Sequence, residues 1–387
     1  MRTICFANKL MPDKPCGGGA GVLFRLYKAN SIHRLIDNIT FVFLDKVIIQ
    51  NNGEQVYNIN SSSEDETYTV RQLMQYYEVI IPAFGMNDDD VYIFHDLDSF
   101  YAFYNIHGGI KHSLVVYHGQ GSLYNEALSS GMEPDESFRQ ACIELTWFAI
   151  EHSTVFAFPS SGAEQALIDT MPEINDVLKC HRTEILYNGC TPETEKDDGN
   201  SQVGQLTEFL QTLECIRFVS VCTLNEAKGI DLVPDFFNEL KKKTDFIWIL
   251  IGNGVKGTEI AGKIKRYNLS DNVIWIPEWL SNDDIIRVMK YTDFYIMYHR
   301  FSIFDFSTIE AMHMGNVPVL SPVGGNLEMV KEDSGYFLKS PDDADGFLEW
   351  YESKNINELR NKNILIADKY FSEKVFLQRY ADVIETI

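Results

Sequence analysis

Short apolar runs alternate with amphipathic stretches along most of the chain. The runs are rich in Val, Ile and Phe and are bounded by polar or turn-forming residues, which is typical of buried β-strands. Between them, apolar residues recur at helical spacing, for example over Glu136–His152 and Thr258–Tyr267. Strands that alternate with helices form parallel sheets of βαβ units. The pattern therefore predicts an α/β protein built from doubly wound parallel sheets.

The predicted strands and helices extend over nearly the whole sequence. The strands are expected at Thr3–Ala7, Ile39–Leu44, Val79–Ile81, Val91–Phe94, Leu114–Tyr117, Val155–Ala157, Glu184–Leu186, Ile216–Val221, Phe246–Ile251, Val273–Ile276, Phe294–Met297 and Val317–Leu320. The helices are expected at Val22–Ala29, Glu136–His152, Ile230–Lys242, Thr258–Tyr267 and Asp283–Tyr291, with a helical region at Asn357–Ile387.

A chain of 387 residues is longer than one hydrophobic core usually serves, so two domains are expected. The segment Gly189–Gly204 is rich in charge, Gly and Pro and poor in apolar residues, as interdomain linkers are. We expect a first domain over residues 1–200 and a second over residues 201–365. A terminal helix over residues 366–387 is expected to pack back on the first domain, and Asn58–Thr67 is expected to form an exposed insertion.

Charge and cysteine content limit the classes of partner and the cellular location that we expect. Lys and Arg total 33 and Asp and Glu total 56, a net charge of −23 that would repel nucleic acid and anionic lipid. The seven cysteines are scattered without metal-binding spacing, as in reduced cytosolic proteins. The chain starts without an apolar signal core and has no membrane-length apolar run. We expect a cytoplasmic protein that at most touches the inner face of the membrane peripherally.

A glycine-rich loop, Pro15–Gly21, follows the first predicted strand and precedes a helix. Glycines allow a ligand to approach the backbone and allow positive φ, so the loop is either a phosphate or sugar cradle or a tight strand-to-helix turn. The spacing Gly19-x-Gly21-x-x-Phe24 lacks the third glycine of a dinucleotide fingerprint, which argues against a nicotinamide enzyme.

Two histidines, His95 and His118, follow predicted strands. Ligands of doubly wound folds bind at the carboxyl ends of strands, so either ring is placed to hydrogen-bond a substrate hydroxyl. The alternative is an imidazole packed and satisfied beneath the loops. Asp96 and Asp98 have the spacing of a divalent-cation site, but this spacing is common by chance in so acidic a chain, and no metal site is expected.

The second half has two loops suited to phosphate. Lys228 precedes a helix after a strand, where it would meet a diphosphate as a point charge, or else is an exposed loop lysine. Gly252-Asn253-Gly254 brings backbone amides to the end of the next strand. Tyr298–Glu328 reads as loop, helix, strand and Gly-Gly turn, and a helix start binds anions. Glu310 on that helix would accept the two hydroxyls of a ribose or complement the helix dipole.

Together these segments resemble the family 4 glycosyltransferases. VCTLNEAKG, IGNG and SIFDFSTIEAMHMGNVPVLSPVGGNLE are similar, in order and spacing, to that family's second-half pattern. The first half matches through the glycine-rich loop, His118 and the LYNG sequence of Leu186–Gly189. The resemblance implies the GT-B architecture, in which two Rossmann-like domains face an interdomain cleft, and a retaining enzyme.

The resemblance also implies roles for individual residues. His118, Lys228 and Glu310 would be catalytic, with His118 against the transferred sugar, Lys228 on the donor diphosphate and Glu310 on the ribose. The implied donor-binding residues are Gly17, Gly18, Gly19, Thr223, Lys228, Gly252, Asn253, Arg300, Ser302, Phe304, Asp305, Phe306 and Glu310.

Three positions depart from the family pattern. Ser302 replaces the first glutamate of the family's pair, Thr223 the arginine that helps to neutralise the diphosphate, and Asp305 the glycine of the Phe-Gly loop. Arg300 or Arg25 would have to substitute for the lost arginine. Asp305 is the nearest carboxylate that would take over contacts to donor-sugar hydroxyls.

The expected activity is retaining transfer of a sugar from a nucleotide-diphosphate donor, a UDP-sugar, to a hydroxyl of a glycan, glycolipid or glycoprotein. No carboxylate has the context of a covalent nucleophile, so the acceptor would attack from the face that the leaving group departs, without metal or cofactor. The missing arginine and glutamate motivate an alternative, a non-catalytic GT-B protein that binds sugar or a partner transferase. A sugar-nucleotide epimerase is a third possibility.

Overall fold

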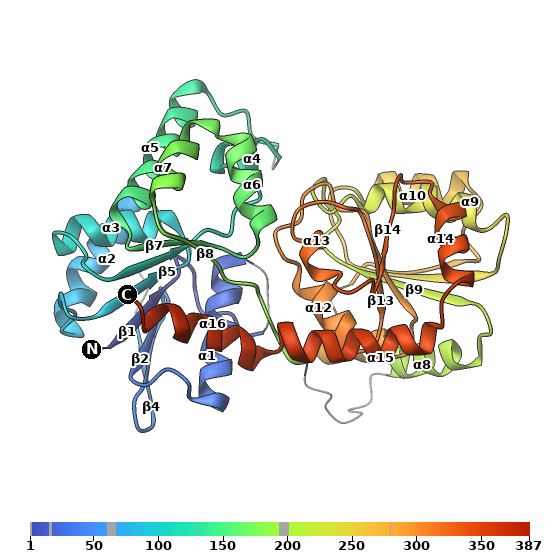
Figure 1. Cartoon of the computed structure of the whole chain (residues 1–387), viewed down its shortest axis with the longest axis horizontal. Helices are drawn as coiled ribbons and strands as arrows, with labels where there is room; N and C mark the ends of the chain where they lie inside the picture. The colour runs from blue at the N-terminus through green and yellow to red at the C-terminus, as the bar shows by residue number, and fades with distance from the viewer. Residues whose placement is uncertain (1, 15–17, 60–66, 130, 193–200, 279) are drawn as a thin grey trace. The chain divides into compact units, whose positions relative to one another are not determined.

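The computed structural model describes residues 2–14, 18–59, 67–129, 131–192, 201–278 and 280–387. The chain divides into two compact units (Figure 1). The first unit comprises Met1–Asn188 and Glu373–Ile387, and the second comprises Gly189–Ser372. The chain thus passes between units after residues 188 and 372, where the sequence suggested residues 200 and 365. Gly17 and most of the predicted insertion at Asn58–Thr67 lie outside the described residues.

The first unit is an α/β layer structure. Its elements are β1 (Thr3–Phe6), α1 (Gly18–His33), β2 (Ile39–Val42), β3 (Lys46–Gln50), β4 (Glu54–Asn58), α2 (Val70–Ala83), β5 (Val91–Phe94), α3 (Leu97–His107), β6 (Ser113–Val116), α4 (Leu123–Ser129), α5 (Glu136–His152), β7 (Val155–Phe158), α6 (Ser161–Thr170), a 3₁₀ turn (Pro172–Ile174), α7 (Asn175–Cys180), β8 (Thr183–Ile185) and α16 (Glu373–Ile384). The described strands lie in the order β4-β3-β2-β1-β5-β6-β7-β8. All neighbouring strands pair in parallel except β3, which pairs antiparallel with both β2 and β4 at one edge.

Six of the described helices of the first unit form two groups. The helices α2, α3, α5 and α7 pack in succession on one side, and α1 packs against α16 on the other (Figure 1). The central strands β1, β5, β6 and β7 are buried along their whole length, as strands covered on both faces must be.

The second unit repeats this plan. Its elements are α8 (Ser201–Thr212), β9 (Ile216–Val221), a 3₁₀ turn (Ile230–Leu232), α9 (Val233–Leu240), β10 (Phe246–Ile251), α10 (Gly257–Arg266), β11 (Val273–Ile276), α11 (Asn282–Lys290), β12 (Phe294–Met297), α12 (Phe306–His313), β13 (Val317–Leu320), α13 (Asn326–Met329), β14 (Tyr336–Phe337), α14 (Ala344–Glu352), α15 (Ile356–Ile366) and a π-helical turn (Ala367–Phe371). The described strands are all parallel, in the order β11-β10-β9-β12-β13-β14. One helix group, α9, α10 and α14, and another, α8, α11, α12 and α15, pack on the sheet.

The prediction of two doubly wound parallel sheets is confirmed, with an antiparallel edge added to the first. The strand predicted at Val79–Ile81 is wrong, because these residues lie in α2. That helix begins at a capping box in which Thr69 and Gln72 bond each other's backbone amides, and a local start signal of this kind outweighs a short β-branched run. The hairpin of β3 and β4 was not predicted, since β4 is exposed at every position and shows no alternation.

A buried hydrogen-bonded side chain ties the three central strands of the second sheet together. Ser220 on β9 donates to the carbonyl of Ile296 on β12 at 2.6 Å and accepts from the indole of Trp248 on β10 at 3.0 Å. Ser220 and Trp248 are both fully buried. Water cannot replace the serine oxygen there, so its loss leaves a donor and an acceptor unsatisfied.

Ser220→Ala is therefore expected to lower the free energy of unfolding by about 1–3 kcal/mol. Urea denaturation followed by tryptophan fluorescence would measure the change. Ser270→Ala, at an exposed serine of the same unit, is the matched control and is expected to change stability by less than about 0.5 kcal/mol. Equal effects of the two variants would contradict the bridging role of Ser220.

Candidate functional site

The second sheet reverses its strand order at β9, which has β10 on one side and β12 on the other. Ligands of doubly wound folds bind beyond the carboxyl ends of the strands at such a switch point. The loop after β9 carries Lys228, and the loop after β12 runs from Tyr298 to Asp305 and enters α12. Residues that are far apart in the sequence thus reach one end of the sheet.

Backbone contacts hold these two loops together. The amides of Arg300 and Phe301 both donate to the carbonyl of Ala227, at 2.9 and 3.2 Å. Gly229 has a φ of 58°, and a Cβ there would lie 1.8 Å from the carbonyl oxygen of Tyr298. The Lys-Gly pair is therefore fixed by packing, because only glycine fits between the loops.

The contact between the loops places Lys228 on Asp305. The Lys228 Nζ lies 2.5 Å from Oδ1 of Asp305. The other carboxylate oxygen accepts from the backbone amide and the hydroxyl of Thr308, both at 3.2 Å, and from the Tyr295 hydroxyl at 3.4 Å. Asp305 is thus the N-cap of α12. The anion expected at this helix start is present as one of the protein's own carboxylates.

The ion pair shifts the pKa of both partners. Burial acts to lower the pKa of Lys228, but the Asp305 carboxylate outweighs burial and raises it. Burial acts to raise the pKa of Asp305, and Lys228 and then His299 outweigh it and lower this pKa to about 2. Both groups of the pair are therefore charged at neutral pH.

Arg300, at the same end of the sheet, also faces carboxylates. Its guanidinium binds both oxygens of Asp231, at 2.7 and 2.8 Å, and lies 3.2 Å from Glu226. Lys256 bridges Glu226 and Glu259 at 2.5 and 3.2 Å. Thr223, where the resembled family has an arginine, is exposed. The bidentate pairing with Asp231 gives Arg300 a fixed place in the loop.

Four more predicted residues lie on α12 or on the loop that precedes it. Glu310 lies within α12 and is 4% exposed. Ser302 is buried, and its carbonyl accepts from the Gly325 amide at 2.8 Å. Phe304 is buried against Phe371, with ring centroids 5.3 Å apart. Phe306 is the first residue of α12 and is half-buried.

The turn after β10 reaches the β9 loop by backbone contacts. The carbonyl of Asn253 accepts from the Leu224 amide at 2.9 Å. Gly252 has a φ of 136°, and a Cβ there would lie 2.0 Å from the carbonyl oxygen of Cys222. These contacts account for the Gly-Asn-Gly sequence as packing, and the exposed Asn253 side chain accepts from the Gly254 amide at 2.7 Å.

The first sheet has its own switch point, at β1 between β2 and β5. Gly19, in the first turn of α1, approaches His95 so closely that a Cβ would lie 2.6 Å from the His95 carbonyl oxygen. His95 Nδ1 lies 3.0 Å from His118 Nε2. Gly18 has a φ of 71° and opens the helix. The structure thus brings together the glycine loop and both strand-end histidines.

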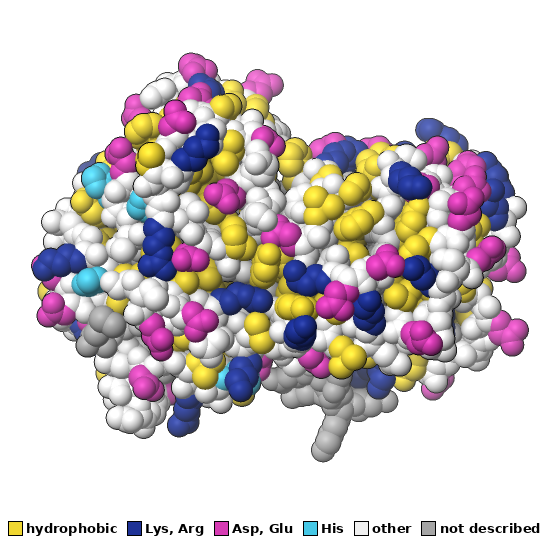
Figure 2. Space-filling view, in the orientation of Figure 1, with side chains coloured by type: hydrophobic (Ala, Val, Ile, Leu, Met, Phe, Trp, Pro, Cys, Tyr) yellow, Lys and Arg dark blue, Asp and Glu magenta, His cyan; other side chains and the backbone are white. Residues whose placement is uncertain are grey.

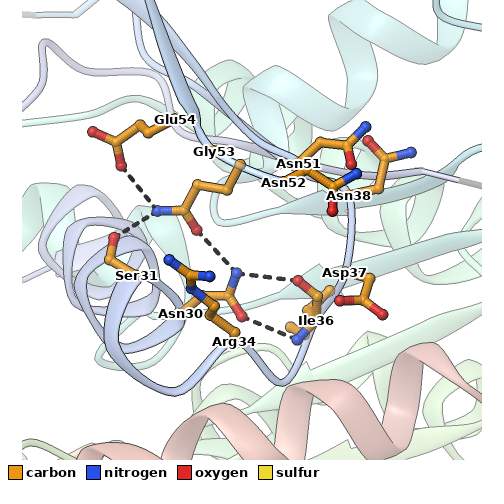
Figure 3. A pocket seen from close by; sticks show the side chains of 11 residues that line it. Asn30, Ser31, Arg34, Ile36, Asp37, Asn38, Asn51, Asn52, Gly53 and Glu54 are labelled. Carbon is orange, nitrogen blue, oxygen red and sulfur yellow. Dashed lines mark hydrogen bonds between the residues drawn. The ribbon is translucent and has the colours of Figure 1, made fainter.

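A polar pocket of about 460 Å³ lies at the opposite end of α1 (Figure 3). Its lining comes from the end of α1, from the connection between α1 and β2 and from the β3–β4 hairpin, and Gln50 links Asn30, Ser31 and Glu54 by hydrogen bonds. The pocket contains none of the predicted site residues. Its hydrogen bonds hold the hairpin against α1, so its role is structural.

Within the described ranges, no group of three or more His, Cys, Asp or Glu is arranged to hold a metal ion. Across the same ranges, no helix combines the length and hydropathy needed to cross a bilayer. On the face visible in Figure 2, acidic and basic side chains are interspersed.

Residues 213–364 match the sequence family described as "Glycosyl transferases group 1". This match covers Lys228, Arg300, Asp305 and Glu310. The second unit carries a glycosyl transferases group 1 domain. The resemblance to glycosyltransferases is thereby confirmed for that domain.

Curated relatives match part of the chain. Glycogen synthase of Elusimicrobium minutum is 28% identical over 180 residues, which are 43% of this chain and 36% of that protein. An uncharacterised protein of Sulfolobus islandicus rod-shaped virus 1 is 26% identical over 111 residues, 29% of each chain. The chain thus spans about a third of the length of these relatives.

Solved structures match the whole chain in fold. Sucrose-phosphate synthase from Thermosynechococcus elongatus is 14% identical over 100% of this chain and 99% of its own, with a TM-score of 0.70. The Anabaena protein HepE, solved with UDP and glucose, is 15% identical over all of both chains, with a TM-score of 0.66. At these identities the likeness shows the fold alone, which is that of the GT-B glycosyltransferases.

The sequence alone did not single out two buried residues of the glycosyl transferases group 1 domain, His299 and Asp231. His299 is 1% exposed; burial first, and Lys228 second, lower its pKa to about 4. Its ring contacts the side chain of Asn326 at 3.3 Å. Asp231, 2% exposed, anchors Arg300. His299 lies one residue before Arg300 in the sequence, but only the fold shows that it lies near the ion pair.

Asp305→Asn in the glycosyl transferases group 1 domain should release Lys228 while an amide retains the helix cap, because Asn caps helices as well as Asp. Affinity for inorganic pyrophosphate is expected to rise by about tenfold or more, the value of one charge-assisted hydrogen bond. Calorimetric titration would measure it.

The matched control is Asp271→Asn, which removes one charge from an exposed loop of the same unit. It is expected to leave pyrophosphate affinity nearly unchanged. A similar gain in both variants would mean that net charge, rather than the Lys228 pair, limits anion binding.

Proposed function

We propose that the protein transfers a sugar from a nucleotide-diphosphate donor, a UDP-sugar, to a hydroxyl of a glycan, glycolipid or glycoprotein acceptor, with retention at the anomeric carbon. The observation that mainly supports this proposal is the ion pair between Lys228 and Asp305. It lies at the start of α12, one turn before the buried Glu310, within a glycosyl transferases group 1 domain. The bound UDP of the structural neighbour HepE supports the choice of donor.

In this proposal, donor binding is an exchange of partners. The diphosphate displaces the Asp305 carboxylate from Lys228 and forms an ion pair with the lysine in its place. Glu310 then accepts hydrogen bonds from the ribose hydroxyls, and the amides from Phe304 to Phe306 face phosphate or sugar oxygens. Charge on the leaving diphosphate is stabilised by Lys228 and by the amino end of α12.

The released Asp305 carboxylate is then available to accept hydrogen bonds from donor-sugar hydroxyls. His118 of the first unit contacts the transferred sugar. The acceptor hydroxyl attacks from the face that the diphosphate leaves, and a phosphate oxygen takes its proton, so the reaction calls for no metal or cofactor. The proposed location is the cytoplasm, with at most peripheral contact to the membrane.

A second candidate is a non-catalytic protein that binds sugar or a partner transferase. The pairing of Lys228 with Asp305 and of Arg300 with Asp231 favours it, because both cations already have carboxylate partners. The absence of an arginine at Thr223 points the same way. This candidate predicts binding without turnover.

A screen of nucleotide sugars, read out by release of the nucleotide, tests the transferase. We expect turnover with at least one UDP-sugar and a loss of about tenfold or more in kcat/KM for Lys228→Met, which removes a charge-assisted contact. Lys265→Met, an exposed lysine on α10, is the control with the same charge change and should behave like wild type.

Failure of every donor to react, with nucleotide affinity unchanged in Lys228→Met, would reject the enzyme. Product analysis by NMR would show the anomeric configuration. Conversion of the donor sugar without acceptor would instead indicate an epimerase.

Glu310→Gln tests the ribose contact separately. A carboxylate accepts strongly from both ribose hydroxyls, whereas an amide accepts through one oxygen only. Wild type should bind UDP more tightly than 2′-deoxy-UDP, and the variant should lose most of that preference, a change of about 3- to 10-fold in the affinity ratio. Competition binding would measure it, and an unchanged ratio would contradict the assignment.

A further inference from the structure

The two strand-end histidines of the first unit meet edge to edge. The ring planes are inclined by only 15°, and the centroids are 5.3 Å apart while the facing nitrogens are 3.0 Å apart. Rings stacked face to face would have closer centroids for the same contact. The pair is therefore an in-plane N–H···N hydrogen bond between His95 Nδ1 and His118 Nε2.

Burial makes both rings neutral. His95 is 3% exposed, and burial and then the neighbouring His118 hold the pKa of His95 well below its usual value. Burial lowers the pKa of His118 to about 4. Two neutral imidazoles share one proton along this bond, so one ring donates and the other accepts.

The direction of this hydrogen bond follows from Nε2 of His95, the ring nitrogen that does not face His118. His95 Nε2 is buried and has no hydrogen-bond partner among the described residues. If His118 donated, the proton of His95 would lie on Nε2 as a buried, unpaired N–H. Orphaned buried N–H groups are rarer in proteins than under-satisfied acceptors. The arrangement with a bare His95 Nε2, in which His95 Nδ1–H donates to His118, is therefore favoured.

We propose that His95 is a positioning residue that fixes His118 as the Nδ1–H tautomer, so that His118 offers a hydrogen-bond donor to an oxygen of the transferred sugar. His118 remains partly exposed, and its Nδ1 makes no hydrogen bond within the described part of the chain. Gly19 seats α1 against the His95 backbone, which holds this ring at the switch point. The role of the sugar in this inference rests on the proposed function.

Nuclear magnetic resonance of ¹⁵N-histidine-labelled full-length protein tests the tautomer without any substrate. His118→Asn assigns the His118 signals. Wild type should show a protonated Nδ1 and a bare Nε2 in His118. His95→Asn, whose amide N–H replaces Nδ1–H, should retain this tautomer. His95→Asp, whose carboxylate only accepts, should reverse it. A protonated Nε2 in wild type, or no reversal in His95→Asp, would overturn the proposal.

Turnover of the donor found by the screen supplies the second measurement. His95→Leu and His95→Asp should lose about tenfold in kcat/KM, the value of one hydrogen bond, while His95→Asn stays within about twofold of wild type. The control is His152→Asn at an exposed position of α5. Equal losses in His95→Asn and His95→Leu would show a merely structural role and reject the inference.

If wild type turns over no donor, the proposed function fails and the tautomer result alone decides the position of the proton.

Discussion

The ion pair between Lys228 and Asp305 is the interaction on which the second unit's switch point depends. One carboxylate pairs the lysine, caps α12 and accepts from Tyr295 on β12, so it joins the β9 loop to the β12 loop and to the helix behind them. Removing one partner of a largely buried pair leaves an uncompensated charge. A ligand that takes Lys228 must therefore supply its own negative charge, as a diphosphate does.

Arg300, the neighbouring cation, exchanges its carboxylate partner less readily than Lys228 does. Arg300 is held by two parallel hydrogen bonds to Asp231, a planar arrangement that a monodentate competitor does not reproduce. Lys228 meets Asp305 as a point charge on a flexible stem. The geometry thus assigns Arg300 to building the loop and leaves Lys228 as the cation able to exchange.

The sequence predicted the buried parts of the fold best. Val91–Phe94 and Phe246–Ile251 appear as strands with the predicted bounds because both are apolar throughout, whereas the exposed β4 carries no such pattern. Motif spacing singled out Lys228 and Asp305 separately. Their pairing spans 77 positions and depends on Gly229 fitting beneath Tyr298, which no local pattern encodes. Similarly, His95 was left between a ligand contact and a packed ring, and only the bond to His118 distinguishes the two.

The two switch points use one strategy with different chemistry. Each places a polar side chain where a ligand would bind and holds it with a second side chain from the adjacent strand's loop: a lysine by a carboxylate in one unit, an imidazole by an imidazole in the other. The net charge of −23 repels an anionic ligand at long range, so the affinity for such a ligand must come from short-range contacts. A preset partner lowers the cost of burying each group before the ligand arrives. In the proposed mechanism, the partner in the second unit then moves aside, whereas the partner in the first unit stays and fixes which atom of His118 carries the proton.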